Sequence, residues 1–118
     1  MLNHHTIFED ISRDPVAAFI QHTGASVDTE LQNLPTLTQE GIARYVICGV
    51  KPGSFLLAVF AGERTIAEHK ADHLNKPLLM QYFAFVETEC PRDCHGSSDK
   101  VRAWVERGGV LGLEVTNG

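Results

Sequence analysis

Residues 55–60 read Phe-Leu-Leu-Ala-Val-Phe and begin the longest apolar run of the chain, which extends to Ala61. A sharp turn at Lys51-Pro52-Gly53-Ser54 leads into this run. A segment that is apolar on nearly every side is typical of a buried element, so we expect it to be the central helix of the fold. A buried strand is the alternative, because periodicity does not separate the two structures in so short a run. We favour the helix.

Helix signals also occur upstream of this run. Asp14 followed by Pro15 predicts a helix start, because the carboxylate accepts free amide hydrogens of the first turn and proline fits at the first helical position. Gly24 ends the apolar stripe of that helix. The capping-box spacing from Thr6 to Glu9 predicts a short helical turn before it.

A second helix is expected from Thr38 to Gly49, directly before the turn. Leu37 and Ile42 occupy the positions of a hydrophobic staple across its start. We expect Ile42 and Tyr45 to face the core.

Three further helices are expected downstream of the central run. The first covers residues 63–74 on the surface and ends near Asn75. The second is strongly amphipathic, with Leu78, Leu79, Tyr82, Phe83 and Val86 as its stripe, and Pro91 closes it. The third is capped by Ser97 or Ser98 and ended by Gly108, and it buries Val101, Trp104 and Val105.

These elements predict a mainly α fold, a compact single-domain bundle of about five to six short helices. Within the single domain 1–118, residues 1–36 form a divergent N-terminal region, residues 37–108 the helical core and residues 109–118 a tail. The stretch Val110 to Val115 is expected to be a short strand or a docked tail. A chain of 118 residues with 43% hydrophobic and 21% charged residues suits one folded domain.

Charge and hydropathy exclude several classes of function. The net charge of −5 disfavours direct binding of DNA or RNA, because that affinity comes from clustered Lys and Arg. The apolar run 55–61 is far shorter than a membrane span, and the N-terminus lacks the pattern of a secretory signal. The odd count of three cysteines favours reduced thiols. We therefore expect a soluble cytoplasmic protein.

Cys90, Cys94 and His95 form a Cys-x3-Cys-His cluster, and thiolate and imidazole are the ligands that zinc prefers. A fourth ligand is needed, and Cys48 or the pair His4 and His5 would have to supply it through the fold. Buried structural thiols are the alternative interpretation. A zinc ion is thus one candidate, and no other cofactor is expected.

The turn Pro52-Gly53-Ser54 is a candidate ligand site, because a Gly-Ser turn at a helix start presents free amides and a hydroxyl to an anion. A purely structural turn explains the same residues equally well. Asp72 and Asn75 lie at helix ends, so a ligand contact and a purely structural role are again both possible. The cations Arg44, Lys51 and Arg102 would assist a phosphate if the fold gathered them.

Residues 42–104 resemble a type of small uncharacterised protein encoded by bacteriophages and prophages. The matching pieces are Gly49-Val50-Lys51-Pro52-Gly53-Ser54-Phe55-Leu56 with Ala58-Val59, then Ala71-Asp72 with Asn75, and finally Cys94, Gly96-Ser97, Val101 and Trp104. The chain departs from that pattern at His95, where an aromatic residue is expected, and at Gly62-Glu63-Arg64. The resemblance implies a phage origin and an accessory role in a bacterial host.

Three functions follow from these features. The first is a non-enzymatic accessory protein that binds and inhibits or redirects a host defence protein, because the sequence has no Walker loop, dinucleotide fingerprint or nucleophile elbow. Its interface is expected in the N-terminal region or around Met80, Tyr82 and Phe85. The second is a homo-oligomeric binder that sequesters a phosphorylated signalling nucleotide. The third is a zinc-stabilised interaction module.

Overall fold

The apolar run forms a helix in the middle of the molecule. The computed structural model describes residues 4–112, and the side chains from residue 6 onward. Helix α4 (Ser54–Ala61) buries most of the run, including Leu56, Val59 and Phe60. The helix expected here is therefore confirmed, and residues 4–112 contain no strand.

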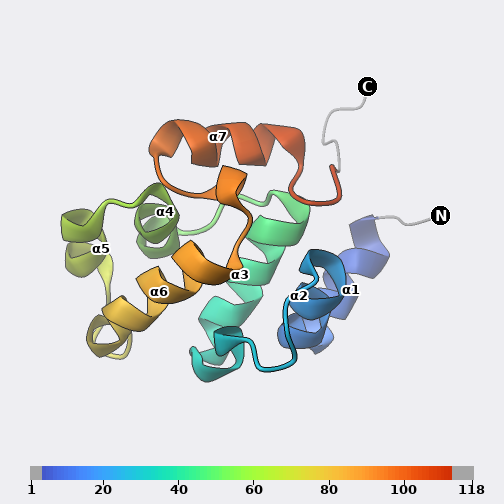
Figure 1. Ribbon diagram of the computed structural model, residues 1–118, viewed down its shortest axis with the longest axis horizontal. Coiled ribbons are helices and arrows are strands. Elements are labelled where there is room, and N and C mark those ends of the chain that lie inside the picture. Colours follow the sequence, from blue (N-terminus) through green and yellow to red (C-terminus); the bar gives the residue numbers. More distant parts are fainter. Residues whose placement is uncertain (1–3, 113–118) are drawn as a thin grey trace.

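Seven α-helices and three short 3-10 helices make up the part of the chain that the structure describes (Figure 1). In chain order these are α1 (His4–Arg13), α2 (Pro15–Thr23), η1 (Glu30–Asn33), α3 (Thr36–Cys48), α4, α5 (Arg64–Lys70), η2 (Lys76–Leu78), α6 (Leu79–Glu89), η3 (Arg92–Cys94) and α7 (Ser98–Arg107). The mainly α, single-domain prediction is confirmed. No helix among these residues is long and apolar enough to cross a membrane.

The N-terminal helices pack on one side of α3. Asp14 caps α2 as predicted, with its Oδ1 accepting from the amide of Ala17 at 3.0 Å, and Gly24 ends the helix with a φ of 78°. Helix α1 is longer than the single turn expected around Thr6 to Glu9. Its apolar side chains form a small cluster with α2 and α3, made of Ile7, Ile11, Ala18, Ala43, Ile47 and Cys48.

The start of α3 differs from the prediction. The helix begins at Thr36, with Pro35 before it, and Leu37 is 85% exposed. The predicted staple between Leu37 and Ile42 is therefore wrong, because Leu37 points away from the core that Ile42 enters. The end of α3 at Gly49, with a φ of 74°, is as expected.

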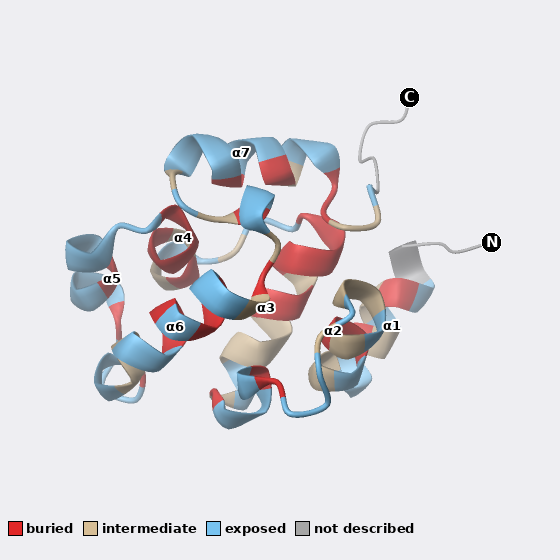
Figure 2. Cartoon of the chain, in the orientation of Figure 1, coloured by how far each residue is buried: buried red, intermediate tan, exposed pale blue. Residues whose placement is uncertain are grey.

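The main core lies where α3, α4, α6 and α7 meet, and buried residues line the facing sides of these helices (Figure 2). The ring centroids of Tyr45 and Phe60 lie 4.5 Å apart, and those of Phe19 and Phe85 lie 5.5 Å apart. Both pairs are tilted, a geometry that favours ring contact. The core thus draws aromatic residues from four different segments, α2, α3, α4 and α6.

Helix α5 is shorter than the helix expected over residues 63–74. It ends at Lys70, and the Oδ1 atom of Asp72 then accepts from the amides of Leu74 and Asn75 at 3.1 and 2.8 Å. This side chain competes with helical bonding for the backbone, which is why the helix stops early.

The C-terminal ends of α7 and α3 form a close seam. The indole Nε1 of Trp104 donates to the carbonyl oxygens of Tyr45 and Val46 at 3.1 and 3.2 Å. Gly49 and Gly109, both with a φ of 74°, meet backbone to backbone. A Cβ atom on Gly109 would lie only 2.5 Å from the carbonyl oxygen of Ile47, so no larger residue fits there.

The start of the predicted tail docks onto this seam. The amides of Val110 and Leu111 donate to the carbonyl oxygens of Val46 and Ile47 at 3.0 and 3.1 Å. Residues 110–112 form turns rather than a strand. The remaining residues of the expected strand, 113–115, lie outside the described part of the chain.

Candidate functional site

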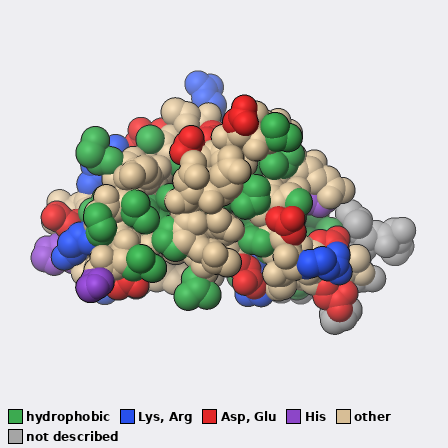
Figure 3. Space-filling view, turned by 90° about the horizontal axis from the view of Figure 1, so that it is seen from below, with side chains coloured by type: hydrophobic (Ala, Val, Ile, Leu, Met, Phe, Trp, Pro, Cys, Tyr) green, Lys and Arg blue, Asp and Glu red, His purple; other side chains and the backbone are tan. Residues whose placement is uncertain are grey.

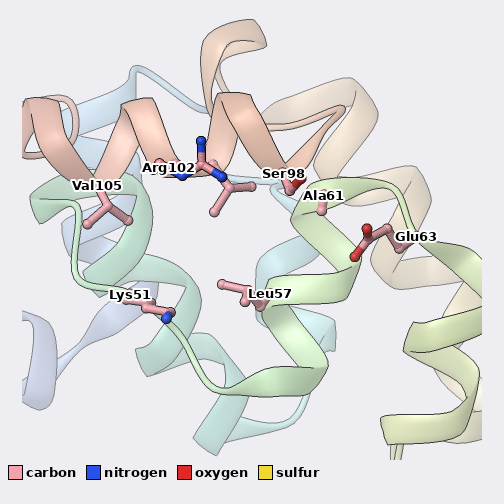
Figure 4. Close-up of a pocket in the computed structure, with 8 residues that line it drawn as sticks. Lys51, Leu57, Ala61, Glu63, Ser98, Arg102 and Val105 are labelled. Atoms are coloured by element: carbon pink, nitrogen blue, oxygen red, sulfur yellow. The ribbon is translucent and has the colours of Figure 1, made fainter.

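A pocket of about 260 Å³ opens between α4 and α7, beside the loop that follows α3 (Figure 4). Its floor is apolar and its rim is charged. Ala61 and Val101 are buried in the floor. The remaining lining residues are the half-buried Leu57 and Val105 and the polar Lys51, Glu63, Ser98 and Arg102.

Local structure fixes the rim residues. Helix α3 ends in a left-handed glycine at Gly49, which turns the chain toward Lys51. Gly62 ends α4 in the same way, and the amide of Glu63 donates to the carbonyl oxygen of Ala58 at 2.9 Å. The amide of Gly96 donates to the carbonyl oxygen of Phe60 at 2.8 Å and so ties the segment before α7 to the end of α4.

Two of the three charges on the rim, those of Lys51 and Glu63, are uncompensated within the described part of the chain. Among residues 6–112, neither the ammonium of Lys51 nor the carboxylate of Glu63 has an ion-pair or hydrogen-bond partner. Arg102 pairs with Asp99 at 3.2 Å. Both side chains are largely exposed, so this ion pair contributes little to the stability of the fold. Figure 4 shows Lys51 and Arg102 toward one end of the pocket and Glu63 toward the other.

The predicted ligand turn is not part of this pocket. Gly53 has an ordinary φ of −67° and open space at its Cβ position, so the turn does not require a glycine there. Ser54 makes no capping hydrogen bond, and Pro52 does not line the pocket. Of the three cations named from the sequence, Lys51 and Arg102 both line this pocket.

The third cation, Arg44, lies elsewhere. Its Nη2 atom donates to Glu40 Oε2 at 2.6 Å along the same helix, and it lies 3.4 Å from the hydroxyl of Ser12. The fold therefore does not bring Arg44 to the pocket, and a glutamate at helical spacing holds its guanidinium instead.

Asp72 and Asn75 have a structural role in this fold. Asp72 closes the turn after α5, and the buried Asn75 accepts the hydroxyl of Tyr82 through its Oδ1 atom at 2.5 Å. The same tyrosine hydroxyl lies 2.8 Å from the hydroxyl of Thr38. These bonds join α3, η2 and α6, and they occupy the side-chain oxygens that were expected to meet a ligand.

The predicted zinc ligands do not converge. Cys90 and Cys94 are both buried and free. No three His, Cys, Asp or Glu side chains among the described residues form a group that could hold a metal ion. The side chains of His4 and His5, named as further ligands, lie outside the described residues.

Burial sets the chemistry of this loop. It raises the pKa of the Cys90 thiol well above its usual value, with the neighbouring Cys94 adding to the rise. Burial also lowers the pKa of His95, and the positive charge of Lys100 lowers it further. The Nε2 atom of His95 is buried and has no hydrogen-bond partner among the described residues.

The predicted interface residues divide between the surface and the core. Met80 is 82% exposed, whereas Tyr82 and Phe85 are fully buried, so the interface expected at those two rings is wrong. They belong to the apolar stripe that attaches α6 to the core. Sequence spacing had already placed Tyr82 on that stripe.

Three large apolar side chains nevertheless remain exposed close to the Tyr82 network in the sequence. We call the exposed side chains of Leu37, Leu74 and Met80 the apolar face. Leu37 and Leu74 adjoin Thr38 and Asn75, whose side chains both bond to Tyr82, and Met80 lies two residues before that tyrosine. Figure 3 shows hydrophobic side chains at several places on the side of the molecule seen from below Figure 1.

Sequence reasoning missed several of these residues. Leu37 was expected to pack in a hydrophobic staple, and Glu63 was named only as the start of a surface helix and as a departure from the phage-protein pattern. Contacts between distant segments decide their positions, and short-range spacing does not encode such contacts. No protein-family model, curated protein or solved structure matches the chain.

Proposed function

We propose that this protein is a non-enzymatic accessory protein of a phage or prophage, and that it binds a protein of the bacterial host through the apolar face. One observation carries the proposal. Leu37, Leu74 and Met80 are 85%, 60% and 82% exposed, and each lies within two residues of Thr38, Asn75 or Tyr82, whose side chains share one hydrogen-bond network. Large apolar side chains gathered on one face are typical of protein-binding surfaces.

The composition of the face suits a protein partner. Methionine is enriched in interfaces because its flexible thioether fits irregular surfaces. The net charge of −5 favours a partner with basic groups around its own apolar patch, since opposite fields speed the encounter. We therefore expect a host protein with an apolar recess and a basic rim.

The chemistry of the cysteines supports a non-enzymatic role. A thiol attacks as the thiolate, and burial disfavours that form. Burial raises the pKa of Cys48 to about 11 and that of Cys90 in the same direction. Both thiols are therefore protonated and poorly nucleophilic near neutral pH.

The other two functions expected from the sequence have less support. A site for a phosphorylated nucleotide was expected at Pro52-Gly53-Ser54, and these residues lie outside the pocket of Figure 4. The zinc-stabilised module was expected at Cys90, Cys94 and His95, which form no metal-binding group with any other described residue.

The test is co-purification from the bacterial host with matched variants. The triple variant L37S/L74S/M80S removes the apolar face, and V27S removes a side chain that is 75% exposed in the loop between α2 and η1. We expect wild type and V27S to retain the same partner in the same amount, and the triple variant to lose it. Equal retention by all three proteins, at equal thermal stability, would contradict the proposal.

A further inference from the structure

We infer that the pocket between α4 and α7 binds a small zwitterion, in which a carboxylate and an ammonium group are separated by a short apolar chain, as in an ω-amino acid. This site is separate from the apolar face, and the inference does not depend on the proposed host partner. It rests on the order of charges around the pocket.

Lys51 and Arg102 provide the end of the pocket that receives the carboxylate. Lys51 has no partner among residues 6–112, so a ligand carboxylate replaces only water around its ammonium group. Arg102 shares its guanidinium with the largely exposed Asp99, which leaves other donors of the group available. Two cations beside one recess favour an anionic group there.

Glu63 and Ser98 provide the opposite end. The carboxylate of Glu63 lies on the rim without a partner among residues 6–112, and Figure 4 shows it directed toward the pocket. An ammonium group is the natural partner of such a carboxylate, and the hydroxyl of Ser98 offers a further acceptor. A purely anionic ligand would be repelled at this end.

The floor between the two ends suits methylene groups. Ala61 and Val101 are buried, and Leu57 and Val105 are half-buried beside them, so an aliphatic chain would replace water on an apolar surface. The volume of about 260 Å³ lies just below the usual range for drug-sized ligands, which begins near ~300 Å³. Both features favour a short linear ligand over a nucleotide.

A homologous series of ligands tests the order of charges. The probes are γ-aminobutyrate, δ-aminovalerate and ε-aminocaproate, with caproate and hexylamine as analogues that lack one charge, and binding is measured by chemical-shift changes of the pocket amides. We expect one chain length to bind best, and both single-charge analogues to bind about tenfold more weakly or worse. Binding of caproate as tight as that of ε-aminocaproate would overturn the inference, and so would no binding of any zwitterion.

Two substitutions assign the ends of the ligand. Lys51→Gln is expected to lower the affinity for ε-aminocaproate and for caproate alike, by about tenfold. Glu63→Gln is expected to weaken the binding of ε-aminocaproate to about the level of caproate, and not to weaken the binding of caproate. The controls are Lys70→Gln and Glu68→Gln on the exposed side of α5, outside the pocket lining. An equal effect of control and pocket variants would overturn the assignment, and because none of these residues touches the apolar face, the result is independent of host binding.

Discussion

Two buried tyrosines organise two very different regions of this molecule. Tyr45 donates its hydroxyl to the carbonyl oxygen of Cys94 at 2.7 Å, and its own carbonyl accepts from Trp104. Tyr82 bonds to Asn75 and Thr38. Both rings are inaccessible to solvent and both hydroxyls have protein partners. The two regions differ in how far the chain around each tyrosine is covered by other segments of the protein.

The region around Tyr45 is closed. There the ends of α3 and α7 meet through Gly49 and Gly109, and the chain after α7 bonds back to α3. The region around Tyr82 is open, because Leu37, Leu74 and Met80 are exposed, each within two residues of Thr38, Asn75 or Tyr82 in the sequence. This open region contains the surface that we propose binds a host protein.

The largest effect is expected at the closed seam. Gly109→Ala forces a left-handed backbone onto alanine and places a Cβ atom 2.5 Å from the carbonyl oxygen of Ile47. We expect the free energy of unfolding to fall by roughly 3–5 kcal/mol, measured by urea denaturation. Gly24→Ala is the matched control, because Gly24 has a φ of 78° but open space around it. It should lose only about 1 kcal/mol, and equal losses would contradict the close packing of the seam.

An intermediate effect is expected from the tyrosine hydroxyls. Tyr45→Phe and Tyr82→Phe each leave a carbonyl oxygen without its donor, at a cost of about 1–3 kcal/mol. Hydrogen exchange distinguishes the two regions. Tyr82→Phe should speed exchange of the Leu74 and Asn75 amides, which depend on the turn that Tyr82 holds, and Tyr45→Phe should not. Faster exchange at these amides in both variants would show that the regions are not independent.

A smaller, pH-dependent effect is expected from His95, which follows the carbonyl that Tyr45 binds. Burial lowers its pKa below the ordinary 6.5 in the folded protein, so the unfolded chain takes up a proton first as the pH falls. The stability contributed by neutral His95 is therefore present above about pH 6.5 and is lost as the pH falls below it. His95→Phe removes this dependence and the partnerless Nε2 atom.

The melting temperatures of wild type and His95→Phe are measured as a function of pH. The series starts at pH 7.5 and ends at the pH below which the melting temperature of wild type no longer changes. We expect His95→Phe to raise the melting temperature slightly at neutral pH and to lose less stability on acidification. An unchanged pH profile would place the titration at another group.

The smallest effect on stability is expected at the open face. Leu37→Ser, Leu74→Ser and Met80→Ser each should change the free energy of unfolding by less than about 0.5 kcal/mol, because these side chains are already exposed. Thermal denaturation of each variant tests this expectation. A loss above about 1 kcal/mol would mean that the side chain packs into the fold, and would remove it from the apolar face.

Local signals predicted much of the fold. Asp14 with Pro15, and the glycines that end α2, α3 and α7, act within a few residues of themselves, so the sequence alone located these boundaries. The central helix was also foreseen from residues 55–60. The early end of α5 was not, because a single side chain, Asp72, captures the backbone there.

The candidate sites were less predictable. Lys51 and Arg102 were named as cations, but only the packing of α7 on α4 brings them to one pocket with Glu63. Tyr82 and Phe85 were expected in an interface because aromatic residues are frequent there, and the same stripe instead attaches α6 to the core. Which side of a helix meets solvent depends on its neighbours, and periodicity within the helix does not give that information.

The most direct test of the account is site-specific photo-crosslinking in host cells. The photoreactive amino acid benzoylphenylalanine replaces Met80 in one protein and Val27, an equally exposed side chain outside the apolar face, in the other. The account predicts a single heavier adduct with one host protein from position 80 and none from position 27. The same adducts from both positions, or from position 80 only an adduct between two copies of this chain, would contradict it.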